Sequence, residues 1–193
     1  MQEKTGKRET ATLKRRKHIV QAAALCFIDQ GFHQTSVRDI AKRANISLGN
    51  LYNHFENKTA LIAEIAALEA EELAGVAKTL SSAAAPEKRM ERFIKAYFKA
   101  VSGKENAVLT AEIMAEAMRN PSIAEGYNAN RQALLTALIP LVEALHLGTQ
   151  PRSRAELILD MIEGAGIRVA FEGIRAKKAT MHALIGWILP KKG

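Results

Sequence analysis

An all-α fold is predicted by three features of this sequence of 193 residues. Its composition is 48% hydrophobic but only 5% aromatic, which favours packed helices over a β-sandwich. Apolar residues recur at helical spacing, and no alternating strand pattern of useful length is found. Breaks rich in Gly, Pro or Asn divide the chain into about nine helices, so we expect a three-helix head followed by a helical body.

The first helix is predicted from about Thr10 to Gln30, with a basic run at residues 14–17 near its start. Gly31 is expected to end this helix, because glycine readily adopts the left-handed conformation of a helix C-terminus. We assign residues 1–12 to a basic and polar arm, of which residues 1–9 are expected to be mobile.

Two short helices joined by a tight turn follow. The helix of residues 36–44 is expected to begin with a capping box, since Asp39 follows Ser36 by three residues. Asn45 suits the turn, because asparagine tolerates the left-handed conformation. Ser47 is predicted to cap the next helix, which runs to about residue 55.

The rest of the chain reads as a helical body. Asn57 is expected to cap a long helix that runs from Lys58 to about Leu80. Five further helices are predicted at residues 87–102, 105–119, 122–146, 152–175 and 178–189. We place the boundary after residue 57, which gives a head of residues 13–57 and a body of residues 58–193.

Net charge and composition limit the classes of function that this sequence can have. The formal net charge is +8, and most of the basic excess lies in residues 1–58, as expected for a phosphate-binding surface. Ordinary solubility charge is the alternative. Cys26 is the only cysteine, so no internal disulfide is possible, and the five histidines are scattered. We expect no catalytic set, metal site or cofactor. The polar N-terminus and the lack of a long apolar run predict a cytoplasmic protein without a membrane partner.

The short third helix has the character of a DNA-reading helix. Gly49 is unfavourable in a helix by about 1 kcal/mol relative to Ala, and close approach to DNA would explain it. Asn50 is suited to a base edge or a phosphate. Side chains placed to contact phosphates are Thr35, Ser36, Arg38, Tyr52, His54 and Lys58. A three-helix packing unit without a ligand is the alternative.

These residues resemble the DNA-binding head of the TetR family of transcriptional regulators. The resemblance covers roughly residues 13–65 and rests on spacing that is specific to that family. Asn45 stands where the family usually has glycine. The matching stretches are Thr35-Ser36-Val37-Arg38-Asp39-Ile40-Ala41, Ala44-Asn45-Ile46-Ser47, Gly49-Asn50-Leu51-Tyr52-Asn53-His54-Phe55 and Lys58-Thr59-Ala60-Leu61.

The resemblance implies a homodimer that reads a palindromic operator in double-stranded DNA, most often as a repressor released by a small-molecule effector. It implies that Thr35, Tyr52, His54 and Lys58 hold phosphates. Bases would be read by residues 47–53, which add Ser47, Leu48 and Asn53 to the candidate DNA-binding residues. The remaining alternative is a nucleoid-associated DNA-binding protein on the same fold without ligand control.

The body carries two further sets of candidate residues. In the TetR family, which this sequence resembles, the last two long helices form the dimer interface. The resemblance implies that the interface here uses Leu157, Met161, Ala165, Leu184, Trp187 and Ile188. Aromatic and Met side chains that suit an adaptable effector cavity are Phe93, Tyr97, Met114, Met118, Tyr127 and Met161. Plain core packing is the alternative for both sets. Glu112, Glu116 and Arg119 are expected to form a surface or capping network.

Overall fold

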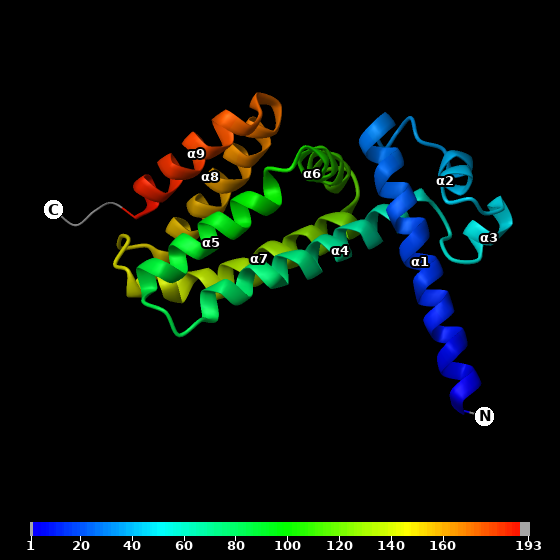
Figure 1. The fold of residues 1–193 in the computed structure, drawn as a ribbon, viewed down its shortest axis with the longest axis horizontal. Helices are drawn as coiled ribbons and strands as arrows, with labels where there is room; N and C mark the ends of the chain where they lie inside the picture. Colours follow the sequence, from blue (N-terminus) through cyan, green and yellow to red (C-terminus); the bar gives the residue numbers. More distant parts are fainter. Residues whose placement is uncertain (1, 190–193) are drawn as a thin grey trace. The chain divides into compact units, whose positions relative to one another are not determined.

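The computed structural model describes the backbone of residues 2–189 and the side chains of residues 10–173 and 177–189. Within that part of the chain the regular structure is nine α-helices and one 3-10 helix, with no strand (Figure 1). The all-α prediction is therefore confirmed. None of the helices described is both long enough and apolar enough to cross a membrane.

The described chain forms two compact units. The first contains residues 2–68 together with Glu112–Ala124, and the second contains Glu69–Ala111 together with residues 125–189. This division differs from the predicted boundary after residue 57. The reason is that the segment Glu112–Ala124, far away in sequence, packs with the N-terminal helices.

The first unit is built on α1 (Gln2–Gln30), α2 (Val37–Arg43), α3 (Leu48–Tyr52) and the start of α4 (Lys58–Ala77). The helix α1 begins eight residues earlier than predicted, so the expected mobile arm is helical from Gln2. Gln, Glu, Lys and Arg are frequent there, and all four are good helix formers. The prediction for Gly31 is confirmed by its φ of +82°.

One apolar core joins the helices of the first unit. Each helix turns fully buried side chains inward, and these hold the helices together because their apolar surface is removed from water. The largest are Ile19 and Phe27 of α1, Ile40 of α2, Leu51 of α3, and Leu61 and Ile62 of α4.

The second unit contains the rest of α4, a 3-10 turn (Lys78–Ser81), α5 (Pro86–Val101), the first part of α6 (Lys104–Ala117), most of α7 (Pro121–Ala144), α8 (Pro151–Glu172) and α9 (Ile174–Ile188). Each lies within a few residues of its prediction. Three of the helices start on a proline, which is favoured in the first turn because it has no N–H group to leave unpaired.

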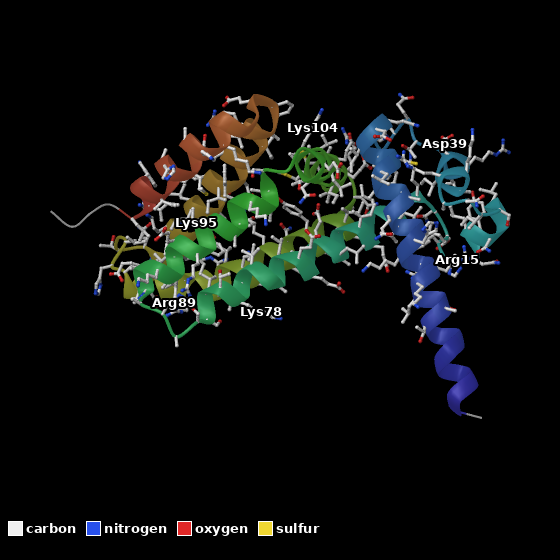
Figure 2. All side chains as sticks on the ribbon, viewed as in Figure 1. Arg15, Asp39, Lys78, Arg89, Lys95 and Lys104 are labelled. Atoms are coloured by element: carbon white, nitrogen blue, oxygen red, sulfur yellow. The ribbon has the colours of Figure 1, made fainter. Side chains whose placement is uncertain are left out.

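In the second unit α8 packs against both α5 and α9 (Figure 1). Gly166 of α8 makes this possible, because a Cβ atom there would lie 3.2 Å from the backbone carbon of Val101. Arg89, at the start of α5, donates its Nε–H to the carbonyl of Leu80 at 2.7 Å and so closes the preceding turn (Figure 2).

The predicted interface residues of α8 and α9 divide into two groups. Leu184 and Ile188 are buried in the core of the second unit. Their face of α9 packs on the protomer's own helices. Leu157 and Trp187 keep 52% and 55% of their surface exposed. Met161 and Ala165 are partly buried against the core.

Candidate nucleic-acid interface

The segment α2–turn–α3 has the local structure that the sequence predicts. Ser36 Oγ accepts the N–H of Asp39 at 3.2 Å, and Asp39 Oδ2 accepts the N–H of Ser36 at 2.9 Å, which confirms the capping box. The hydrogen bond from the Ser36 side chain, followed by the one from its backbone, holds the pKa of Asp39 below its usual range. The start of α2 is thereby fixed, with Arg38 exposed beside it.

The turn and the start of α3 also follow the prediction. Asn45 has a φ of +50°, the left-handed conformation expected of it. Ser47 Oγ accepts the N–H of Asn50 at 3.1 Å and caps α3. Asn57 likewise accepts the N–H of Ala60 at 2.8 Å at the start of α4. Side-chain caps therefore determine where these short helices begin.

The outer side of α3 is open to a partner. Leu51 and Phe55 are buried and hold α3 to the core of the first unit. Gly49 is exposed, and a Cβ atom there would meet no heavy atom within 4 Å. Packing inside the unit therefore does not require a glycine at this position. Residues that flank it with exposed or half-exposed side chains are Ser47, Leu48, Asn50, Tyr52, Asn53 and His54.

The basic run of residues 14–17 contains one residue with partners inside the first unit and three exposed residues. Arg16 donates to the carbonyl of His54 at 2.8 Å and to Glu64 at 2.9 Å, and its guanidinium lies 4.3 Å from the ring centre of Phe55. It therefore anchors the residues that follow α3. The other members of the run, Lys14, Arg15 and Lys17, are exposed, and Arg15 is marked on α1 in Figure 2.

Thr35 is placed differently from its prediction as a phosphate contact. Its side chain is only 1% exposed. The hydroxyl donates to the carbonyls of Gly31 at 2.8 Å and Cys26 at 3.1 Å. It therefore binds the end of α1, where the last carbonyl groups of a helix lack partners within the helix.

Lys58 is also bonded to groups of the first unit. Its ammonium group donates to the carbonyl oxygens of Phe32, His33 and Thr35, at 3.4 Å for His33 and 2.9 Å for Thr35. It also lies 4.3 Å from the ring centre of Phe32. Burial lowers the pKa of this lysine. The ammonium group therefore stabilises the turn after α1.

Sequence reasoning missed a pair of acidic contacts to the same turn. Glu112 of α6 accepts the backbone N–H of Phe32 at 2.8 Å. Glu116, one turn later and 8% exposed, accepts from His33 Nε2 at 2.9 Å. The spacing of four residues between Glu112 and Glu116 places both on one face of α6, which the sequence does show. The sequence predicted a surface network for them and did not predict that they contact the turn after α1. Glu116 also pairs with Arg119 at 3.2 Å, as that network expects.

The predicted effector residues fall in both units. Phe93 and Tyr97 are buried and stacked, with ring centres 5.6 Å apart, while Tyr127 and Met161 are partly buried in the same unit. Met114 and Met118 belong to the first unit, where Met118 is 83% exposed. These two methionines therefore belong to a different unit from the other four candidates. Among the described residues no group of three or more His, Cys, Asp or Glu could hold a metal ion.

Comparison with known proteins confirms the family resemblance. Residues 19–65 match the family described as bacterial regulatory proteins of the tetR family, and residues 86–189 match the C-terminal family of BetI-type transcriptional repressors. The chain is 34% identical over 186 residues to the HTH-type transcriptional regulator UidR of Escherichia coli K12, covering 90% of this chain and 92% of that protein. These relatives are regulators and not enzymes, as the sequence predicts.

Solved structures agree on the fold. Salmonella enterica GusR superposes with a TM-score of 0.68 at 25% identity, covering 91% of this chain and 96% of that chain. A putative transcriptional regulator from Saccharomonospora viridis, solved in complex with choline, has a TM-score of 0.79 at 18% identity, covering 92% of this chain and 97% of that chain. At that identity the likeness shows the fold alone.

Replacing Arg16 by alanine is expected to reduce the free energy of unfolding by about 1–2 kcal/mol, because both its hydrogen bonds and its packing on Phe55 are lost. Arg15→Ala on the same helix removes an exposed side chain and should change stability by less than about 0.5 kcal/mol. Urea unfolding followed by circular dichroism measures both. Equal losses in the two variants would contradict the role assigned to Arg16.

Replacing Glu112 by alanine leaves the N–H of Phe32 without its acceptor, so a loss of about 1–2 kcal/mol in unfolding free energy is expected. Glu112→Gln keeps a carbonyl acceptor at the same place and should lose less. The same urea titration compares the two variants with the parent chain. The contact is unimportant if alanine and glutamine both behave like glutamate.

Proposed function

This chain belongs to the TetR family of transcriptional regulators, and we propose that it is a repressor that binds a palindromic operator as a homodimer and is released by a small-molecule effector. Its relatives include the HTH-type transcriptional repressor KstR2 of Mycolicibacterium smegmatis, 33% identical over 96 residues that cover 49% of this chain and 47% of that protein.

The observation that carries the proposal is the exposed, open position of Gly49 in the first turn of α3. A glycine costs a helix about 1 kcal/mol, and the unit itself has no steric need for it. Close approach of α3 to DNA in the major groove supplies the missing reason. In the proposed interface Asn50 faces base edges, while Tyr52 and His54 face phosphates.

The proposed DNA contacts differ from the sequence prediction at two positions. Thr35 and Lys58 are left out, because their side chains are bonded within the first unit. Ser36 and Arg38 remain, since both are exposed at the start of α2. The other proposed contacts are Ser47, Leu48, Gly49, Asn50, Tyr52, Asn53 and His54.

The exposed apolar side chains of α8 and α9 support a homodimer. Leu157 and Phe171 of α8 and Trp187 of α9 expose 52%, 83% and 55% of their surface, and large apolar side chains left exposed on neighbouring helices suit an interaction surface. Trp187 also stacks with Arg154, whose guanidinium lies 4.6 Å from its ring centre. A dimer would place two copies of α3 to read two half-sites, about 34–36 Å apart.

The proposed effector site lies in the second unit. Phe93, Tyr97, Tyr127 and Met161 all belong to it, and mixed aromatic and Met side chains suit small-molecule sites. Met114 and Met118 are not included. The choline bound by the Saccharomonospora viridis protein is a small organic molecule, which supports an effector of similar size for this chain.

The direct test is capture of sheared genomic DNA from the source organism by the purified protein, followed by sequencing of the retained fragments. A small set of palindromic fragments next to promoters is expected. Uniform retention across the genome would instead favour a nucleoid-associated protein. Failure to retain any DNA, including after extensive dialysis to remove a bound effector, would overturn the proposal.

Gly49→Ala is expected to stabilise the protein by up to about 1 kcal/mol, because alanine favours the helix and the position is open. Its affinity for the captured operator should nevertheless fall about tenfold or more, because the added methyl group meets DNA. Gly75→Ala is the matched control, since Gly75 is an exposed and open helical position of α4. It should change operator affinity little. Unchanged affinity in Gly49→Ala would remove the main support for the interface.

Leu157→Glu is expected to shift the protein toward monomers, because a buried carboxylate at the interface costs several kcal/mol unless it is paired. Met118→Glu is the control: it introduces the same charge at a residue 83% exposed in the first unit. Sedimentation velocity over a range of concentrations measures both. A Leu157→Glu variant that dimerises like the parent chain would place the interface elsewhere.

A further inference from the structure

The N-terminal part of α1 extends beyond the apolar core of the first unit. The helix is continuous from Gln2, and Figure 1 shows it running past α2 and α3 toward the N-terminus. Residues 10–15 are all exposed, so no side of the helix is buried there, and Leu13 keeps 66% of its surface exposed. The first buried side chain in the described part of α1 is that of Ile19. We call residues 2–17 the α1 extension.

The α1 extension is strongly basic. It contains seven Lys or Arg residues and only two Glu residues, so a quarter of the Lys and Arg of the chain lie in this short segment. Lys14, Arg15 and Lys17 are exposed, and none of them forms an ion pair within the described part of the chain. Contacts inside the first unit therefore do not account for these three charges.

Helical spacing places most of these basic residues on one face of α1. Positions 4, 7, 8, 11, 14 and 15 are linked by steps of three or four residues, and such positions are neighbours on a helix surface. Five of the six are Lys or Arg, and the sixth is Ala11. At a rise of about 1.5 Å per residue, the row from Lys4 to Arg15 is about 16 Å long. Like charges at this spacing repel one another, so an anionic partner relieves a cost that the free helix carries.

Arg16 fixes the α1 extension beside the residues that follow α3. Its guanidinium donates to the carbonyl of His54 at 2.8 Å and lies 4.3 Å from the ring centre of Phe55. Arg15 and Lys17 are its neighbours in the chain and lie within about 1.5 Å of it along the helix axis. His54 is one of the residues proposed to face phosphates. The cations of the extension therefore begin where the proposed DNA contacts of α3 end.

We propose that the α1 extension binds the phosphate backbone of double-stranded DNA beside each operator half-site. The inference rests on the proposed function, because it takes the operator as the bound DNA. Charge complementarity identifies the partner: a DNA duplex carries about one negative charge per 1.7 Å of its axis, and a row of cations neutralises several of these charges. Phosphate contacts carry no sequence information, so the extension adds affinity and not base specificity.

An anionic membrane surface is a poorer match for the same helix. Amphipathic helices that bind lipids carry large apolar residues along the face opposite their cations. Leu13 is the single large apolar residue of the α1 extension, so the extension lacks such a face. DNA phosphates require only the cations, which the extension has.

Binding of the full chain to the captured operator and to an unrelated duplex of the same length tests the proposal. The variant Lys14→Gln/Arg15→Gln removes two exposed charges and keeps good helix formers. It is expected to weaken binding to both duplexes about tenfold or more at low salt, by similar factors. The slope of log K against log salt should become shallower by about 0.9 for each phosphate contact that is lost.

A second variant, Lys4→Gln/Lys7→Gln/Arg8→Gln, tests the part of the extension farthest from α3. It should also weaken both duplexes by similar factors and make the salt slope shallower. Hydroxyl-radical footprinting on the operator locates the contact. The parent chain is expected to protect backbone positions that this variant leaves open, next to positions that both proteins protect.

The matched control is Arg92→Gln/Lys99→Gln, which removes two charges from exposed positions of α5 in the second unit. Its affinity for DNA should stay within about twofold of the parent, because distant surface charges are screened by salt. Thermal unfolding of each variant shows that it is folded. The proposal is overturned if the control loses as much affinity as Lys14→Gln/Arg15→Gln. It is also overturned if the α1 variants lose binding to vesicles of anionic phospholipid and keep their affinity for DNA.

The outcomes separate this inference from the proposed function. If the α1 variants bind the operator as tightly as the parent chain, this inference alone is overturned. If the parent chain captures no operator, but binds the unrelated duplex through charges that the α1 variants lack, the phosphate contact is kept and the proposed function is overturned. A parent chain that binds neither duplex overturns both.

Discussion

The turn between α1 and α2 is held by charged side chains that come from two other helices. Lys58 of α4 donates hydrogen bonds to three carbonyl groups of the turn, and Glu112 of α6 accepts a hydrogen bond from the N–H of Phe32. The buried hydroxyl of Thr35 ties the turn to the end of α1. Because the chain passes directly from this turn into α2 and α3, the placement of α3 depends on these contacts as well as on the apolar core.

The two units use buried charge differently. Around the turn after α1, each charged group meets backbone groups that a turn leaves unpaired, so the contacts complete a hydrogen-bonding requirement. In the second unit the carboxylate of Glu163 accepts hydrogen bonds from Arg131 and from the hydroxyl of Tyr97, so its partners are side chains of the same unit.

Much of the head could be read from local sequence, because the relevant contacts join residues close in the chain. The capping box of Ser36 and Asp39 spans three residues, and the conformation of Asn45 is a property of one. The position of Gly49 at the start of α3 also follows from nearby residues, because Ser47 caps that helix. Local sequence is less informative where a residue has several suitable partners. Lys58 was expected to bind phosphate, since its type and position allow that, but its partners are carbonyl groups that the sequence does not place beside it.

The sequence by itself determined the all-α fold, the helix boundaries to within a few residues in most cases, and the family of regulators to which the chain belongs. These follow from apolar periodicity and from caps, which act over one or two turns of helix. Only the tertiary structure decided which side chains are buried and which partners they have. It buried Leu184 and Ile188 and paired Glu112 with a turn 80 residues earlier. Such outcomes depend on packing between distant segments, which no local pattern specifies.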